Sequence, residues 1–275
     1  MTIDPFLWLT PVLLLAILGL MGFVGCQLFL VDNDPKPAAS PKTAAPLQVS
    51  GAAFVGAATA CSVARLRVTG ANFPNGAQVQ WSGAALPTQF VSATQLDASV
   101  TLSDTALTAA DIVVVGPSGE KSPLFHFTFT VAPGAVRVAL AQEAGQPSGP
   151  NIGPVTTVKD FDFGTGQWAW LRDTTDVFSL HFSSPGTTRT FAFRNGATGI
   201  LESMTVRNFA GSANTMTVSD EVGQTASVNL PALVQPIQVL TLTTGWRRCS
   251  NSITVRLQTP SADAGIIEIT YRLPA

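Results

Sequence analysis

The stretch ARLRVTGANFPNGAQVQWSG, residues 64–83, contains a clear strand pattern followed by a turn signal. In its first part Ala64, Leu66 and Val68 alternate with polar side chains. A period of two places the apolar side chains on one face of a β-strand and the polar ones on the other. The NFPNG that follows, at 72–76, is rich in the residues that form turns. The stretch therefore predicts a half-buried strand that ends at a turn.

The same pattern continues through residues 47–131. The run LFHFTFTV, at 124–131, alternates aromatic or aliphatic residues with His and Thr, and turn signals stand at 82–83 and 116–119. Several short strands separated by turns at this spacing are typical of a β-sandwich. We therefore expect residues 47–131 to form one sandwich.

Residues 47–131 also resemble an IPT/TIG domain, a family of immunoglobulin-like sandwiches. The matching positions are Thr69, Gly70, Phe73, Gly76, Val79, Trp81 and Gly83, followed by Val114, Pro117 and Gly119. The resemblance implies an immunoglobulin-like fold and a role in adhesion or as a spacer in a surface protein, and it brings no catalytic residue. We expect Gly70 and Gly76 to serve turns with positive φ, and Trp81 to fill the core.

Residues 132–275 form a second β-rich region that opens with the turn-rich segment 143–154. Alternating runs recur at 189–196, 252–258 and 265–273, the last with Ile267, Ile269 and Tyr271 on one face. They predict a second antiparallel sandwich, for which a jelly roll is one topology. Residues 240–273 are similar to the last strands of galactose-binding-like and carbohydrate-binding jelly rolls. The positions that carry this similarity are Asn251, Ile253, Val255 and Glu268.

The N-terminal segment, residues 1–31, predicts a membrane anchor. Residues 6–31 carry no charge and, as a helix with a rise of about 1.5 Å per residue, would cover the bilayer's hydrocarbon layer. Two kinds of anchor remain open. Phe23 to Cys26 resemble a lipobox, which makes Cys26 a lipidation candidate. However, no Lys or Arg precedes the apolar run and apolar residues continue past the Cys, which favours a retained transmembrane helix.

Residues 32–46 are rich in Pro and Ala and predict an extended, semi-rigid linker. Orientation depends on two conflicting signals. Lys36 and Lys42 follow the apolar segment, and positive charges tend to stay in the cytoplasm. The modules that follow nevertheless resemble those of bacterial surface proteins. We expect the β-modules to be extracytoplasmic, at the cell surface or in the periplasm.

Composition excludes several function classes. With a formal net charge of −2 and 12% charged residues, the chain lacks the basic face of a nucleic-acid binder. It contains none of the common catalytic or phosphate-binding motifs, so we expect no enzyme, no catalytic residue and no cofactor. His126 and His181 lack partners at metal spacing, and Asp160 and Asp162 share a strand face without a calcium-loop pattern. We expect no metal site.

The tryptophans are the ligand-binding candidates. Trp168 and Trp170 are two residues apart and share a strand face, where they could stack on sugar rings but more simply pack a core. Trp246 lies at a predicted turn, so exposure and burial both remain open. Arg247 beside it could hydrogen-bond hydroxyls or carboxylates.

The two remaining cysteines, Cys61 and Cys249, fall in different modules. A bridge between them would have to cross from one module to the other, and disulfide geometry is restrictive. We therefore expect two separate, half-buried thiols.

Two hypotheses for function follow. In the first, the chain is a non-enzymatic, membrane-anchored surface protein whose β-sandwiches bind a glycan or another surface polymer. In the second, it is a structural accessory subunit of a larger membrane complex. There a strip formed by Gly19, Gly22 and Gly25 would let a partner helix pack closely.

Overall fold

The computed structural model describes residues 45–141, 153–165, 168–172, 178–182, 188–233, 238–259 and 264–274. The predicted anchor, with Cys26 and the strip Gly19, Gly22 and Gly25, lies outside these residues, as does almost all of the predicted linker. Within the described ranges, no helix is both long and apolar enough to cross a membrane.

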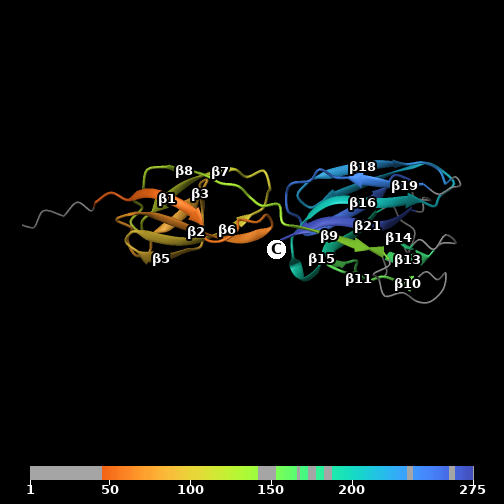
Figure 1. The fold of residues 1–275 in the computed structure, drawn as a ribbon, viewed down its shortest axis with the longest axis horizontal. Helices are drawn as coiled ribbons and strands as arrows, with labels where there is room; N and C mark the ends of the chain where they lie inside the picture. The colour runs from red at the N-terminus through yellow and green to blue at the C-terminus, as the bar shows by residue number, and fades with distance from the viewer. Residues whose placement is uncertain are drawn as a thin grey trace, which may run out of the picture. The chain divides into compact units, whose positions relative to one another are not determined.

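The first group of strands forms two antiparallel four-stranded sheets, in the orders β1-β2-β6-β5 and β4-β3-β7-β8 (Figure 1). The strands are β1 (Gln48–Phe54), β2 (Ser62–Ala71), β3 (Gln78–Trp81), β4 (Ala84–Ala85), β5 (Thr88–Ser92), β6 (Gln95–Leu102), β7 (Ala109–Val115) and β8 (Phe125–Thr128). Each sheet turns an apolar face inward, so the region is a β-sandwich, as the alternating sequence predicts.

The alternation in β2 is confirmed, because Leu66 and Val68 are fully buried and Arg65 is exposed. Trp81 is half-buried and packs in an aromatic cluster with Phe54 of β1 and with Phe127, at ring-centroid separations of 6.2 and 6.3 Å. The predicted core role of Trp81 therefore holds, at the margin of the core rather than at its centre.

The two glycines singled out by the sequence serve different purposes. Gly76 has a φ of 87°, as expected for a turn. Gly70 lies inside β2 without a positive φ, so the expectation for it was wrong. A Cβ at Gly70 would lie 1.9 Å from the carbonyl oxygen of Gln48 and 2.5 Å from the ring of Phe73. Close approach of neighbouring groups, rather than backbone conformation, requires a glycine there.

The second group of strands also forms two antiparallel sheets. One has the order β10-β13-β14-β21-β16-β19 with β9 paired to β21, and the other has the order β11-β12-β15-β20-β17-β18. The strands are β9 (Ala135–Leu140), β10 (Gly153–Pro154), β11 (Thr157–Val158), β12 (Phe161–Asp162), β13 (Trp168–Arg172), β14 (Phe178–Phe182), β15 (Thr188–Phe193), β16 (Ile200–Asn208), β17 (Asn214–Asp220), β18 (Thr225–Leu230), β19 (Val239–Thr243), β20 (Ser252–Leu257) and β21 (Ala264–Leu273). A 3₁₀ turn, η3 (Arg194–Gly196), follows β15.

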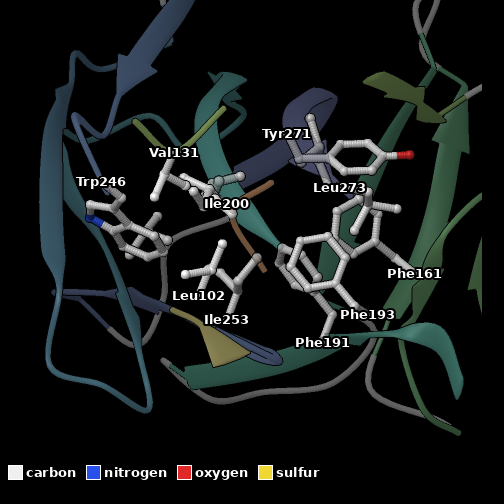
Figure 2. Close-up of a cluster of buried hydrophobic side chains, with 14 of the residues drawn as sticks. Leu102, Val131, Phe161, Phe191, Phe193, Ile200, Trp246, Ile253, Tyr271 and Leu273 are labelled. Carbon is white, nitrogen blue, oxygen red and sulfur yellow. The ribbon is translucent and has the colours of Figure 1, made fainter. Parts of the chain in front are cut away.

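The core of the second group is aromatic. Phe161 packs against Phe191 and Phe193 of β15 and against Tyr271 of β21 (Figure 2). The predicted inward faces at 189–196 and 252–258 are confirmed by the burial of their apolar residues.

The prediction for β21 needs one correction, because its pairing with β16 shifts register at a bulge. Thr205 pairs with Glu268, but the next residue, Val206, pairs with Ile266. A bulge inserts an extra residue and reverses the alternation beyond it. Ile266 is therefore buried and Ile267 is half-buried, whereas the sequence placed Ile267 on the inner face.

The segment that connects β8 to β9 forms hydrogen bonds with both groups of strands. The backbone of Ala132 donates to the carbonyl of Ala58 at 2.7 Å and accepts from the amide of Ala60 at 2.8 Å. Two residues later, the carbonyl of Gly134 accepts a hydrogen bond from Arg272 of β21 at 3.2 Å. These contacts leave little free chain between the sheets of β1–β8 and those of β9–β21.

Candidate functional site

The junction between the two sandwiches is crossed by a disulfide bond between Cys61 and Cys249. Their Cα atoms are 5.4 Å apart, although 188 positions separate them in the sequence. Cys61 immediately precedes β2, and Cys249 lies between β19 and β20. The expectation of two separate thiols was therefore wrong. The two modules meet end to end at these residues, which no pattern within either module reveals.

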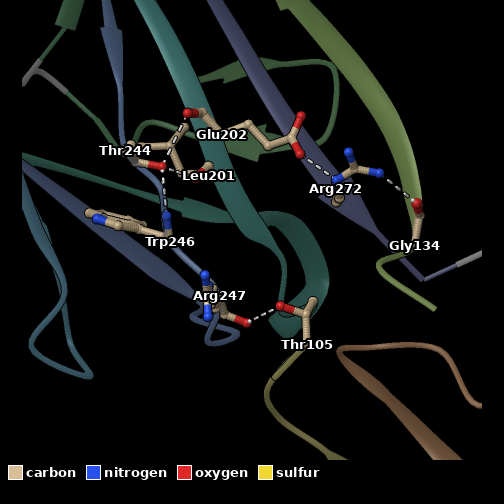
Figure 3. Close-up of polar contacts among 8 residues, drawn as sticks. All are labelled: Thr105, Gly134, Leu201, Glu202, Thr244, Trp246, Arg247 and Arg272. Carbon is tan, nitrogen blue, oxygen red and sulfur yellow. Dashed lines mark hydrogen bonds and ion pairs between the residues drawn. The ribbon is translucent and has the colours of Figure 1, made fainter. Parts of the chain in front are cut away.

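Backbone hydrogen bonds reinforce the disulfide. Asp104 of the first sandwich and Arg248 of the second form an antiparallel β-bridge. The amide of Thr105 donates to the carbonyl of Arg247 at 3.1 Å, and the Thr105 hydroxyl reaches the same oxygen at 3.5 Å (Figure 3). Main-chain groups make most of these contacts, and nearly every residue type supplies such groups. The residue types at 104–105 and 247–248 therefore do not predict the junction. Arg247 itself is exposed, and its carbonyl is the part of it that joins the modules.

Two side chains from the turn between β17 and β18, those of Gln224 and Glu221, accept hydrogen bonds from the backbone of residues 247–252. The Gln224 Oε1 atom accepts hydrogen bonds from the amides of Arg247 at 3.0 Å and Arg248 at 2.9 Å. The Glu221 carboxylate accepts from the amides of Asn251 and Ser252 and from the Ser252 hydroxyl. Burial acts to raise the pKa of Glu221, but these hydrogen bonds to its charged form outweigh burial and lower the pKa.

Trp246 fills the apolar part of the junction. Its indole is only 9% exposed and lies in one cluster with Leu102 and Val131 from the first sandwich and with Ile200 and Ile253 from the second (Figure 2). Its backbone amide donates to the Thr244 hydroxyl at 3.2 Å (Figure 3). Of the two alternatives left open by the sequence, burial is the one observed, so the indole offers no free face to a sugar ring.

Of the other predicted stacking residues, the structure describes the side chain of Trp168. Trp168 is fully buried in β13 and packs against Phe163 and Phe191, with ring centroids 5.4 and 6.0 Å away. Core packing was the favoured interpretation for it. Trp170 lies on the same strand, and its side chain is outside the described part of the structure. Trp246 and Arg247 therefore lie together at the junction, and Trp168 belongs to the aromatic core of the second group.

A cluster of three charged residues lies on the outer side of the first sandwich. Asp97 of β6 is 4% exposed and forms ion pairs with Arg65 and Arg67 of β2, the latter at 3.1 Å. Burial acts to raise the pKa of Asp97, but the hydrogen bonds and charges of the two arginines outweigh burial and lower it. The three charges satisfy one another, so this cluster stabilises the pairing of β2 with β6.

The histidines are less isolated than the sequence suggests. His126 lies 2.9 Å from Asp111 on the paired strand, and His181 is buried 3.0 Å from the Ser179 hydroxyl. Asp160 accepts a hydrogen bond from Tyr271. Among the residues that the structure describes, no three His, Cys, Asp or Glu side chains gather where they could hold a metal ion.

Comparisons with known proteins give limited information. No family model matches the sequence, and no curated protein matches it. Among solved structures, the chain is similar to a SusE-like protein (8% identity, TM-score 0.25, 84% of this chain and 97% of that one). It is also similar to an exo-β-1,3-galactanase from Phanerochaete chrysosporium in complex with galactose (11%, 0.30, 82% and 57%). A third similar structure is a two-domain protein of unknown function from Bacteroides fragilis (8%, 0.26, 83% and 90%). Similarities this weak support no inference about function.

Proposed function

We propose that the chain is a non-enzymatic, extracytoplasmic surface protein whose two β-sandwiches form one rigid binding unit. The disulfide between Cys61 and Cys249 is the observation that carries the proposal. Such bonds form and persist in oxidising compartments and are rare where glutathione and thioredoxin keep thiols reduced. A disulfide that joins two modules also has a mechanical consequence, because it prevents them from separating while the bond is intact.

The strand order of the first sandwich supports an immunoglobulin-like module. Its sheets, β1-β2-β6-β5 and β4-β3-β7-β8, follow the A-B-E-D and C′-C-F-G orders of that fold. This agrees with the IPT/TIG resemblance around Gly76 and Trp81. Modules of this kind serve well as spacers, so the first sandwich would hold the second one away from the membrane. The apolar segment 6–31 would be the anchor.

Localisation tests the proposal directly. Intact cells that produce the full chain are treated with a membrane-impermeant amine reagent, and the peptides that contain Lys121 and Lys159 are quantified. We expect both lysines to be modified in intact cells or, for a periplasmic protein, once the outer membrane is made permeable. Modification that occurs only after complete lysis would place the sandwiches in the cytoplasm and overturn the proposal.

The accessory-subunit alternative gains support from the burial of Trp168 and Trp246. Their burial removes two of the aromatic side chains that a sugar-binding face would use, while a rigid pair of sandwiches suits a structural subunit equally well. Purification from membranes in a mild detergent separates the two functions. A binding protein purifies as a lone chain, whereas a subunit purifies with stoichiometric partners.

A further inference from the structure

A shallow groove of about 360 Å³ lies at one end of the second sandwich, where β17 begins and β18 and β20 end. We call it the amide groove, after the side chains that dominate its lining. Its principal residues are Asn214, Thr215, Asn229, Leu230, Pro231 and Gln258.

The strands hold the groove's polar groups in fixed positions. Thr215 of β17 pairs with Asn229 of β18, and its hydroxyl donates to Asn229 Oδ1 at 3.1 Å. On the other side, the amide of Gln258 donates to the carbonyl of Thr215 at 3.0 Å. The Asn229 and Gln258 side chains are exposed at the rim. The Thr215 contact uses the oxygen of Asn229, so the NH₂ group remains available to a ligand.

Asn214 is the unusual member of the groove. It is only 6% exposed, and its Oδ1 atom accepts hydrogen bonds from the amides of Thr215 at 2.8 Å and Thr259 at 3.2 Å. These contacts fix which end of the amide is the oxygen. The Nδ2 atom is buried and has no hydrogen-bond partner in the described part of the chain. Because buried donors are nearly always paired in native proteins, an acceptor that reached Asn214 Nδ2 from the groove would be stabilised.

The lining selects for an uncharged ligand. None of its residues is charged, so a charged ligand would find no compensating partner. Amide and hydroxyl groups both donate and accept hydrogen bonds, as sugar hydroxyls do. Pro231, which is half-buried, adds apolar surface for the C–H groups of a sugar ring. We infer that the amide groove binds an uncharged saccharide. This inference rests on the proposed binding function and supplies a site and a ligand class for it.

Binding is tested with the full chain in a polyoxyethylene detergent, since glycoside detergents would compete for the site. The probes are neutral cello-, xylo-, manno- and galacto-oligosaccharides, with oligogalacturonate as a charged comparison, and calorimetry measures affinity. We expect at least one neutral probe to bind. The double variant Asn229→Ala/Gln258→Ala should bind it at least about tenfold more weakly, because each lost hydrogen bond costs a few-fold in affinity.

The matched control is Gln48→Ala, which removes an exposed amide from β1 in the other sandwich and should leave affinity unchanged. Thermal unfolding of all variants distinguishes loss of a contact from loss of folding. Equal affinity of wild type and double variant, binding of the charged probe alone, or no binding at all would overturn the groove inference. None of these results would alter the lysine-labelling outcome, which tests the proposed function separately.

Discussion

At the scale of the residue, Trp246 shows how a side chain suited to ligand binding can instead hold two modules together. It lies in one buried cluster with apolar residues of both sandwiches, including Leu102 and Ile253. Trp246→Ala should destabilise the protein by about 3–5 kcal/mol, as deletion of a buried aromatic side chain usually does. Chemical denaturation followed by circular dichroism measures the loss.

The neighbouring Arg247 provides the control for Trp246. Its side chain is exposed, and its junction contacts are made by the backbone, so Arg247→Ala should change stability by less than about 0.5 kcal/mol. A Trp246→Ala variant that is as stable as wild type would contradict burial of the indole.

Two carboxylates predict how stability depends on pH. The pKa values of Asp97 and Glu221 are lowered from their ordinary values of 3.8 and 4.5. A carboxyl with a lower pKa in the folded state binds its proton more tightly when the chain is unfolded. Its stabilising effect is therefore complete above the unfolded-state pKa and is lost as pH falls through the folded-state pKa. Melting temperature should be flat from pH 7 to about pH 5 and should fall below that.

Substitution of each carboxylate measures how much of the loss of stability at acid pH that residue causes. Asp97→Asn should lower stability at pH 7, because Arg65 and Arg67 lose their counter-charge, and should flatten the decline at acid pH. Glu221→Gln should remove a separate part of the decline. An acid limb that is identical in wild type and both variants would show that other groups cause it.

For single residues, the sequence predicts burial in a strand better than it predicts which distant residues a side chain will contact. The core role of Trp81 follows from its place in an alternating strand. The junction role of Trp246 depends on residues far away in the sequence, such as Leu102. The amide groove likewise joins Asn214, Asn229 and Gln258, which lie in three separate segments and match no motif. The signal that reveals it, the unpaired Asn214 Nδ2, exists only in the folded chain.

At the scale of the element, β2 illustrates what alternation predicts and what it misses. Its burial pattern follows the sequence closely, but Gly70 is there for close packing rather than for a turn. Gly70→Ala should destabilise the protein by about 1–3 kcal/mol or more, because the new methyl group would overlap the carbonyl of Gln48. Thermal unfolding measures the change.

Gly211 is the matched control for Gly70. A Cβ added at Gly211 meets no atom within 4 Å, and its φ is not positive. Gly211→Ala should therefore be close to neutral in the same assay. Equal melting temperatures for the two variants would show that β1 and β2 are not as close as the structure places them.

Strands that lie in one continuous alternating run were predictable, and the bulge in β21 was not. In β21, the alternation of inward and outward side chains is shifted by one residue between Ile266 and Glu268, because pairing with β16 imposes the register. Register belongs to a pair of strands, so one strand's sequence cannot fix it alone.

At the scale of the whole molecule, the disulfide between Cys61 and Cys249 is expected to dominate stability. It closes a loop of 188 positions, for which chain-entropy arguments give a contribution of about 5 kcal/mol and measured losses are typically about 2–5 kcal/mol. Cys61→Ser/Cys249→Ser should therefore lower the unfolding midpoint markedly. Reduction of the wild type should lower it by a similar amount and should leave the double variant unchanged.

The all-β architecture was predictable at this scale because strand alternation is a local property. The attachment between the modules was not, because it is built from backbone contacts and from cysteines in different modules. The placement of the two cysteines in different modules suggested two separate thiols, whereas the β-bridge between Asp104 and Arg248 brings the ends of the sandwiches close enough for a bond.

The most direct test is non-reducing peptide mapping of the full chain purified from the cells that produce it, with free thiols alkylated before digestion. We expect a cross-linked pair of peptides that contain Cys61 and Cys249 and that separate on reduction. Recovery of both cysteines as alkylated free thiols would contradict the locked pair of sandwiches, and with it the main support for an extracytoplasmic location.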